Sequence, residues 1–509
     1  MRLCGRGAVL VLIGAIWPAP CLGQEATSET AAPGGQTGRA AISKVVTHHG
    51  VTIDGQRIRY TAETGTITLT DEDGTERANV FFIAYLKEDT IDFAARPLTF
   101  SFNGGPGSSS VWLHLGTLGP RMVVMGDVDA LLPPPWTVAE NPDSILDVTD
   151  LVFIDPVTTG FSRAAPGEDD KQFHGFEEDV EAVGEFIRLW VTKHERWASP
   201  KFLIGESYGT TRAAGLSGYL QDRHGMFLNG VMLVSSILNF QTARFTRGND
   251  LPFALFLPTY TATAWYHKKL APDLQQDLNA ALEAAERFAV GEYAAALMQG
   301  DALAGEARQR IVQQVARFTG LSERFVEQTN LRISQPRFCK ELLRDAGATA
   351  GRLDSRFRGM DFDNAGESTD FDPSMAAIDG PYSTAINHYV RADLEFETDL
   401  PYEVLTGRVR PWNYDNVQNE YLNVAETLRL AMTQNPHLKV FVANGYYDLA
   451  TPYFATKYTF NHMNLDPSLR SHVSMGYYEA GHMMYIHAPS RRQLKTDLAA
   501  FIRGASGAR

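Results

Sequence analysis

The chain has 509 residues, of which 44% are hydrophobic and 21% are charged, and its formal net charge is −14. These proportions are typical of a globular protein with one large domain or two, and they exclude fibrous and disordered chains. An acidic surface repels the phosphate backbone, so we expect no nucleic-acid partner.

The first 23 residues have the pattern of a secretory signal peptide. Arg2 and Arg6 precede an apolar run that is too short to span a bilayer, and small residues then lead to Gly23. We therefore predict an exported protein, periplasmic or secreted, whose mature chain has no membrane span. Attachment of a lipid to Cys21 is the weaker alternative, because two prolines stand just before it.

Removal of residues 1–23 would leave Cys339 as the single cysteine, so the mature chain could form no internal disulfide. Cys339 lies in an apparent helix, where a buried small hydrophobic residue is a better interpretation than a nucleophile. Residues 24–41 are rich in Ala, Gly, Thr and Pro without an apolar period, which predicts a flexible tether.

Strand patterns come next along the chain. Alternating apolar and polar residues on either side of Asp71-Glu72-Asp73-Gly74 predict a β-hairpin, and this tetrad lacks the ligand spacing of an EF-hand. From Pro97 onward, short apolar runs each end in Gly, Asp, Asn or Ser, namely PLTFSFNGGPG, DLVFIDP, KFLIG, GVMLVSS and LKVFVANG. Buried parallel strands have this composition, because helices cover both faces of their sheet.

A helical block, residues 240–398, interrupts this series of strands and predicts a cap inserted over the sheet. The leucines of APDLQQDLNAALEAAERFAV fall on one helical face, with Pro272 and Asp273 suited to the first turn. Ser322 is placed to cap a later helix of the block. We expect Trp265 and Tyr266 to pack in a core rather than to line a substrate pocket.

The pentapeptide Gly205-Glu206-Ser207-Tyr208-Gly209 stands between an apolar run and a helical pattern. Gly-x-Ser-x-Gly at such a junction is the nucleophile elbow, a turn so tight that the residues flanking the serine must be small. A plain glycine turn is the alternative. The elbow predicts an α/β-hydrolase fold, with a central, mostly parallel sheet built from residues 42–239 and 399–509.

A serine nucleophile needs a histidine to take its proton and a carboxylate to orient that histidine, in the chain order Ser, Asp, His. Asp448 follows one predicted strand and His482 follows the next, so both lie where this order requires. Asp466 is the weaker candidate, since it precedes a proline in an apparent turn. The competing histidines, which we expect to be surface or core residues, are His462, His472 and His487.

The segment FNGGPGSSS ends a strand in glycines, whose N–H groups can approach a substrate closely because no Cβ intervenes. A loop N–H and the N–H of the residue after the nucleophile can together hold a developing oxyanion. We predict that Gly105 and Tyr208 form this oxyanion hole.

Taken together, these motifs resemble the serine carboxypeptidase family, peptidase family S10, in its exported bacterial form. NGGPGSSS looks like the family's Asn-Gly-Gly-Pro-Gly-Cys-Ser-Ser motif, and GESYG looks like its nucleophile motif. FIDPVTTGFSRA, NGYYDLATPY and EAGHMMYIHAP are similar to three further motifs. The resemblance implies an enzyme that releases C-terminal amino acids from peptides through an acyl-enzyme on Ser207, with Asp448 and His482 completing the triad.

The resemblance also implies that Asn103, Gly104 and Glu206 bind the C-terminal carboxylate of a peptide substrate. Two carboxyl groups approach closely only if they share a proton, so this binding would favour acidic pH. No cofactor and no metal are implied, and the oligomeric state has no signal in the sequence.

Two positions depart from the family pattern. Ser108 stands where the motif has a cysteine, and Thr117 stands where the family often has a second glutamate. Because one member of the carboxylate-binding set is replaced, two alternatives stay open. One is an esterase or acyltransferase on the same scaffold, and the other is a non-catalytic peptide-binding protein.

Overall fold

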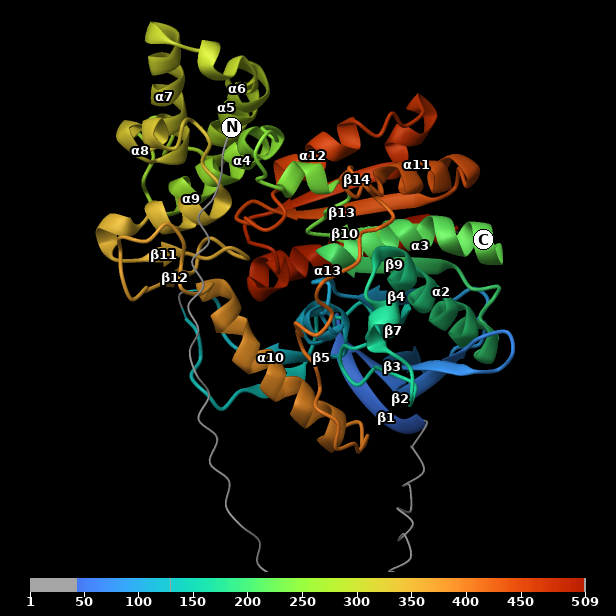
Figure 1. Cartoon of the computed structure of the whole chain (residues 1–509). Helices are drawn as coiled ribbons and strands as arrows, with labels where there is room; N and C mark the ends of the chain where they lie inside the picture. The colour runs from blue at the N-terminus through green and yellow to red at the C-terminus, as the bar shows by residue number, and fades with distance from the viewer. Residues whose placement is uncertain (1–43, 129, 508–509) are drawn as a thin grey trace, which may run out of the picture. The chain divides into compact units, whose positions relative to one another are not determined.

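A computed structural model describes residues 44–128 and 130–507 of the chain (Figure 1). These residues belong to one compact unit, Ile42–Arg509. The predicted signal peptide and tether, residues 1–23 and 24–41, lie outside the described residues. Within the described ranges, none of the helices combines the length and the apolar character that crossing a bilayer would require.

A ten-stranded sheet forms the core, in the order β1-β2-β3-β7-β4-β9-β10-β13-β14, with β8 paired to β3. Neighbours from β7 to β14 are parallel, whereas β1, β2, β3 and β7 pair antiparallel. The predicted α/β-hydrolase fold is thus confirmed. The strands of this sheet are β1 (Lys44–Ile53), β2 (Gln56–Thr70), β3 (Glu76–Lys87), β4 (Leu98–Phe102), β7 (Asp150–Ile154), β8 (Arg163–Ala164), β9 (Lys201–Glu206), β10 (Gly230–Val234), β13 (Lys439–Gly445) and β14 (Val473–Tyr478).

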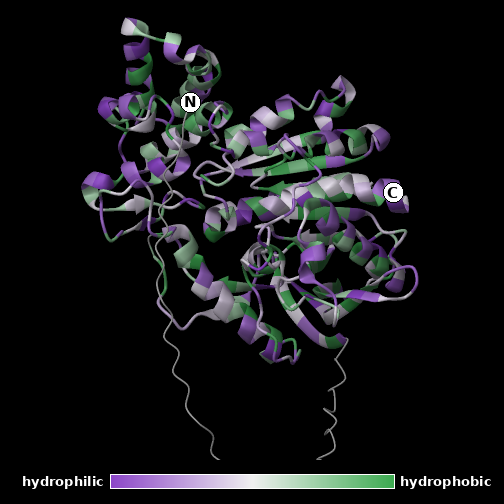
Figure 2. Ribbon diagram, viewed as in Figure 1, coloured by the Kyte–Doolittle hydropathy of each residue, from purple (hydrophilic) through white to green (hydrophobic). Residues whose placement is uncertain are grey.

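Helices cover both faces of this sheet. In β9, Phe202 and Ile204 join the apolar cluster on one face, and Leu203 joins the cluster on the other. Burial on both faces explains why the strands are continuous apolar runs, which Figure 2 shows as green ribbons. The helices α2 (Phe176–Lys193), α3 (Tyr208–His224) and α11 (Ala425–Gln434) pack on the face of Leu203, and α1 (Val111–Leu113), α10 (Pro373–Ala392) and α13 (Ala488–Ala505) pack on the other.

The predicted hairpin is present at one end of the sheet. β2 and β3 pair antiparallel, and Thr70 lies opposite Glu76 across the turn. Asp71 N donates to Thr75 O at 2.9 Å, and Gly74 N donates to Asp71 O at 3.0 Å. The acidic tetrad is therefore the turn of a hairpin.

Between β10 and α10 lies a group of helices with an apolar cluster of its own (Figure 1). This cluster also contains Tyr453 and Phe454 of α12 (Tyr453–Asn461), so the helices pack against a late element of the sheet domain. The cap boundaries at 240 and 398 remain predictions. The helices of the group are α4 (Leu251–Tyr266), α5 (Leu278–Phe288), α6 (Ala294–Gln299), α7 (Gly305–Thr319), α8 (Glu323–Gln328) and α9 (Gln335–Glu341).

Two helix starts test the sequence prediction. Ser322 caps α8 as expected, because its side chain accepts a hydrogen bond from Phe325 N at 3.2 Å. The predicted first turn at Pro272 is wrong, since α5 begins at Leu278. Asp277 caps that helix by accepting a hydrogen bond from Ala280 N at 3.0 Å.

Candidate active site

Ser207 occupies the turn between β9 and α3. Its backbone has φ 60° and ψ −130°, a conformation that non-glycine residues rarely adopt. A Cβ on Gly205 would lie 2.1 Å from the carbonyl oxygen of Gly209, so the turn can close only with glycine at this position. The Ser207 N–H donates to Val234 O of the neighbouring strand β10 at 3.0 Å. This strand–turn–helix arrangement is the one that a nucleophile elbow requires.

Asp448 and His482 follow β13 and β14, and the structure brings them together. His482 Nδ1 lies 2.8 Å from Asp448 Oδ2 in a buried setting. Asp448 Oδ1 accepts hydrogen bonds from the N–H groups of Ala450 at 2.8 Å and Thr451 at 3.0 Å. The Thr451 hydroxyl donates to Asp448 Oδ2 at 2.7 Å. These donors hold the carboxylate in place beside the imidazole.

The pKa of His482 reflects two opposing effects. Burial lowers it, but the charge of Asp448 and the hydrogen bond between the two groups raise it above the usual 6.5. An imidazole of this kind can act as a base near neutral pH, and a carboxylate beside it can stabilise the imidazolium form.

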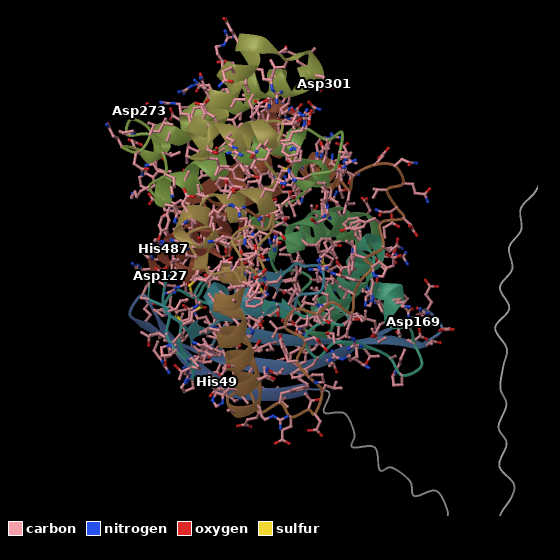
Figure 3. The ribbon with its side chains drawn as sticks, turned by 60° about the vertical axis from the view of Figure 1, so that its left-hand side comes forward. His49, Asp127, Asp169, Asp273, Asp301 and His487 are labelled. Carbon is pink, nitrogen blue, oxygen red and sulfur yellow. The ribbon has the colours of Figure 1, made fainter. Side chains whose placement is uncertain are left out.

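The competing candidates lie elsewhere. His487 is half-buried near Asp127, away from the sheet centre (Figure 3). His462 is exposed, His472 is half-buried, and Asp466 accepts a hydrogen bond within its own turn, as expected. Among the described residues, none of these candidates lines a cavity at Ser207.

Two backbone N–H groups beside Ser207 are available for an oxyanion. A Cβ on Gly104 would lie 2.4 Å from Tyr208 N, which shows how closely the loop after β4 packs on the elbow. Neither Gly105 N–H nor Tyr208 N–H donates a hydrogen bond to another described residue. The predicted pair therefore has free donors at the positions that an oxyanion hole needs.

Glu206 is the last residue of β9, and only 3% of it is exposed. Tyr485 Oη donates a hydrogen bond to Glu206 Oε2 at 2.6 Å. Burial raises the pKa of this carboxyl to about 7, although His482, Tyr485 and Asn103 act in the opposite direction. A carboxyl group with this pKa carries a proton below neutrality, so it can then donate a hydrogen bond to a bound carboxylate.

Asn103 stands beside Glu206 at the end of β4. Its Oδ1 accepts a hydrogen bond from Leu113 N at 3.1 Å, which fixes the amide orientation. Its Nδ2 is buried, and it has no well-formed hydrogen bond to a described residue, although it lies close enough to Glu206 to lower the pKa of that carboxyl. A buried donor of this kind in a cavity wall is available to a ligand.

The sequence profile of the family described as serine carboxypeptidase matches residues 55–484. This chain belongs to the serine carboxypeptidase family. Serine carboxypeptidase-like 16 and serine carboxypeptidase-like 15 of Arabidopsis thaliana are 30% and 29% identical to it over 152 residues. That segment is 29% of this chain and spans only 32% of the length of each relative.

A solved structure shares the fold of this serine carboxypeptidase family member. Kex1(Δ)p, a prohormone-processing carboxypeptidase from Saccharomyces cerevisiae, has a TM-score of 0.54 and 16% sequence identity. The match covers 87% of this chain and 91% of that one. At this identity the likeness establishes the α/β-hydrolase fold, while the bacterial and exported origin stays a prediction.

The two departures from the family pattern have structural consequences. Ser108 Oγ accepts a hydrogen bond from Trp112 Nε1 at 2.8 Å and donates to Ser109 O at 3.0 Å, so it is part of a buried network. Thr117 is buried, and its carbonyl accepts a hydrogen bond from Asn141. It lines neither cavity at Ser207. Among the described residues that line those two cavities, Glu206 is the one with a carboxyl group.

The sequence analysis missed the group that anchors Asn103. Arg212 of α3 is buried, and its guanidinium donates to Asn103 O at 2.6 Å and to Asp179 Oδ2 of α2 at 2.8 Å. The ion pair thus ties the loop after β4 to the two helices beneath it. An arginine among small residues in TTRAAG was the available signal, because a charge at a buried helix position needs a partner.

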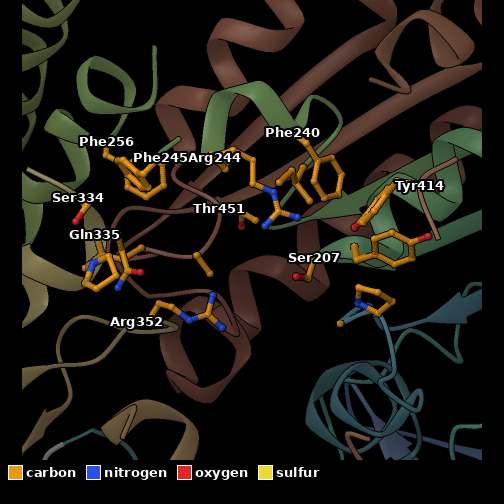
Figure 4. A pocket seen from close by; sticks show the side chains of 18 residues that line it. Ser207, Phe240, Arg244, Phe245, Phe256, Ser334, Gln335, Arg352, Tyr414 and Thr451 are labelled. Carbon is orange, nitrogen blue, oxygen red and sulfur yellow. The ribbon is translucent and has the colours of Figure 1, made fainter. Parts of the chain in front are cut away.

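Two cavities meet at Ser207, which lines both of them. Both are also lined by Gly105, Pro106 and Arg352. The smaller has a volume of about 270 Å³ and includes Asn103, Glu206 and His482 in its wall. The larger has a volume of about 500 Å³, and Figure 4 shows its lining. Trp265 and Tyr266 line neither cavity and pack against the apolar cluster of α4–α9, as predicted.

Proposed function

We propose that the protein is a serine carboxypeptidase that releases C-terminal amino acids from peptides. The observation that supports it is one cavity whose wall contains Ser207 and His482 together with Asn103 and Glu206. Nucleophile, base and carboxylate donors in one cavity of 270 Å³ suit a single residue at the end of a peptide.

The residues would act in the following order. Ser207 Oγ attacks the carbonyl of the last peptide bond, and His482 takes the serine proton while Asp448 holds the opposite ring nitrogen. The N–H groups of Gly105 and Tyr208 bind the oxyanion of the tetrahedral intermediate. His482 then gives its proton to the departing amine as the C–N bond breaks. A water molecule, deprotonated by His482, hydrolyses the acyl-enzyme and restores Ser207.

Recognition of the free C-terminus would depend on three groups. Asn103 Nδ2 and the Gly104 N–H donate to the substrate carboxylate, and protonated Glu206 donates a further hydrogen bond. Since the pKa of Glu206 is about 7, this third donor is present in weakly acidic and neutral solution. An amidated peptide would lose these interactions, because a neutral amide is a poorer acceptor than a carboxylate.

The test is hydrolysis of two N-blocked dipeptides that differ only in a free or amidated C-terminus, measured from pH 4 to 8. We expect fast turnover of the free acid, slow turnover of the amide, and no turnover by the S207A and H482Q variants. H487Q is the matched control, because His487 lies outside both cavities. Equal turnover of the two peptides, or better turnover of a simple ester, would contradict the proposal and favour a broader acyl hydrolase.

We also propose that the protein is exported, since residues 1–23 have a signal-peptide pattern. N-terminal sequencing of the protein from fractionated cells should give a chain that starts near Gln24 outside the cytoplasm. An intact Met1 in the cytoplasmic fraction would contradict this.

A further inference from the structure

The larger cavity at Ser207 has an unusual charge for this protein. The whole chain has 60 acidic residues against 46 lysines and arginines. The 18 residues that line the cavity nevertheless include two arginines, Arg244 and Arg352, and not one Asp or Glu. A cavity of this kind attracts negative charge, even though the protein around it is strongly acidic.

Neither arginine is fully compensated by an acid. Arg244 is exposed, its guanidinium lies over the ring of Phe240 at 5.3 Å, and it forms no ion pair with a described residue. Arg352 Nε is 3.9 Å from Asp372 Oδ2, but half of its side chain is exposed, so the pair is weak. Asp372 Oδ1 is already engaged by Arg352 N and Ser374 N, each at 3.0 Å.

Both guanidinium groups reach into the larger cavity beside Ser207. Figure 4 shows Arg244 and Arg352 reaching into the space beside Ser207 from opposite sides. Phe240 and Tyr414 supply an aromatic wall on the same side as Arg244. Aromatic rings can cover the methylene groups of a side chain while a planar guanidinium binds its carboxylate through two hydrogen bonds.

We propose that this cavity selects substrates with an acidic residue, Asp or Glu, at the position that supplies the scissile carbonyl. The inference rests on the proposed carboxypeptidase function and adds a substrate class to it. Asn103 and Glu206 line the smaller cavity and not the larger one. The C-terminal residue of the substrate therefore belongs in the smaller cavity, and the residue that supplies the scissile carbonyl belongs in the larger one.

The two arginines could instead bind the C-terminal carboxylate of the substrate, and Arg244 separates this alternative from selection of an acidic residue. Arg352 also lines the smaller cavity, together with Arg410, so it can contribute to binding the terminal carboxylate. Arg244 lines the larger cavity only. A change at Arg244 should therefore alter the preference for the acyl-side residue and leave the preference for a free C-terminus intact.

The experiment compares N-blocked X-Leu dipeptides in which X is Glu, Gln or Lys. Glu and Gln have nearly the same shape, so their ratio of kcat/KM reports the charge alone. We expect the wild-type enzyme to prefer Glu over Gln roughly tenfold, as one charge-assisted hydrogen-bonded contact allows. The R244Q variant should lower this ratio to about two, through KM more than kcat, and R244K should retain more of it.

R247Q is the matched control, because Arg247 is exposed on the same loop and does not line the cavity. It should behave as the wild type does. Raising the salt concentration should reduce the Glu preference, since these arginines are partly open to solvent. Equal kcat/KM for Glu and Gln, a preference for Lys, or an R244Q ratio equal to the wild-type ratio would overturn the proposal.

A binding measurement separates this inference from the proposed function. Isothermal titration of the S207A variant with the Glu and Gln peptides needs no turnover. Tighter binding of the Glu peptide to S207A, lost in S207A/R244Q, would support the cavity assignment even if the wild-type enzyme hydrolysed neither peptide. Turnover of both peptides with equal binding would leave the carboxypeptidase proposal standing and remove the acidic preference.

Discussion

Two ionisable side chains in the smaller cavity set the expected pH response. Burial opposes ionisation of both, yet Asp448 raises the pKa of His482 above 6.5, and desolvation raises the pKa of Glu206 to about 7. In the proposed mechanism, catalysis needs neutral His482, whereas binding of the substrate carboxylate needs protonated Glu206. The two requirements overlap near neutral pH, so kcat/KM for a free-acid peptide should fall on both sides of it.

Glu206→Gln should change both limbs of this profile. A glutamine amide donates at every pH, so the loss of kcat/KM above pH 7 should disappear. The carboxylate of Glu206 also helps to raise the pKa of His482. Because Glu206, with its pKa of about 7, is mostly protonated on the acid side, its removal should move the acid limb to lower pH only slightly. The measurement is kcat/KM from pH 4 to 9 on a free-acid dipeptide.

E479Q provides the comparison, because Glu479 is an exposed carboxylate three positions before His482 in the chain. Its profile should match that of the wild type. If E206Q keeps the wild-type alkaline limb, Glu206 is not the group that titrates there.

The sequence could place Asp448 and His482 at adjacent strand ends, and the structure joins them at 2.8 Å. It could not show that Thr451 binds Asp448 or that Tyr485 binds Glu206. Both contacts depend on the direction in which a loop side chain points. Strand periodicity fixes that direction within a strand, but nothing equivalent fixes it in the loop that follows.

At the scale of the element, the β9–α3 junction depends on the absence of side chains. The loop after β4, the elbow and the first turn of α3 approach one another at backbone distance around Gly104, Gly205 and Gly209. This close approach brings free N–H groups next to Ser207, so the packing that closes the turn also builds the site.

Gly205→Ala should therefore cost both stability and activity. The new Cβ would meet the backbone carbonyl of Gly209 at 2.1 Å, and backbone atoms cannot move aside as a flexible side chain can. We expect a loss of roughly 1–3 kcal/mol in the free energy of unfolding and a large loss of kcat. Thermal unfolding and steady-state kinetics on the same samples measure both effects.

Gly504→Ala tests the same substitution in an open site. Gly504 is exposed in α13 and would have nothing within 4 Å of its Cβ. Alanine there should stabilise the protein by about 0.5–1 kcal/mol, because glycine is a poor helix former. A G205A protein as stable and active as G504A would show that the elbow tolerates a methyl group.

The wrongly placed start of α5 shows what periodicity leaves open. Apolar residues recur at helical spacing from Leu274 onward, so the pattern itself has no break at the true boundary. Asp273 and Asp277 can each cap a helix. The choice is made by the hydrogen bond from Ala280 N to Asp277, a local contact that composition cannot rank.

At the scale of the whole molecule, sequence separation limits what can be predicted. The apolar runs predicted as parallel strands are all parallel strands of one sheet. Their lateral order was not predictable, since β7 pairs between β3 and β4 although it follows both in the chain. Strand order depends on contacts between distant segments, and local patterns carry no record of those contacts.

We expect the helices between β10 and α10 to unfold together with the sheet, because the described residues form one compact unit. Cys339 in α9 reports on these helices. It is 2% exposed, and burial raises the pKa of its thiol to about 12, so a thiol reagent should not reach or react with it in the folded protein. In a chain that begins at Gln24 it is also the single thiol.

A second thiol can report on the sheet in the same way. Ser217 of α3 is buried, and Ser217→Cys in a Cys339→Ala background changes only one oxygen to sulfur. We expect the two thiols to become labelled at the same denaturant concentration, because the cluster that contains Cys339 extends to Tyr453 and Phe454 of α12. Labelling of Cys339 at a clearly lower concentration, with Ser217→Cys still protected, would show instead that the helices open separately from the sheet.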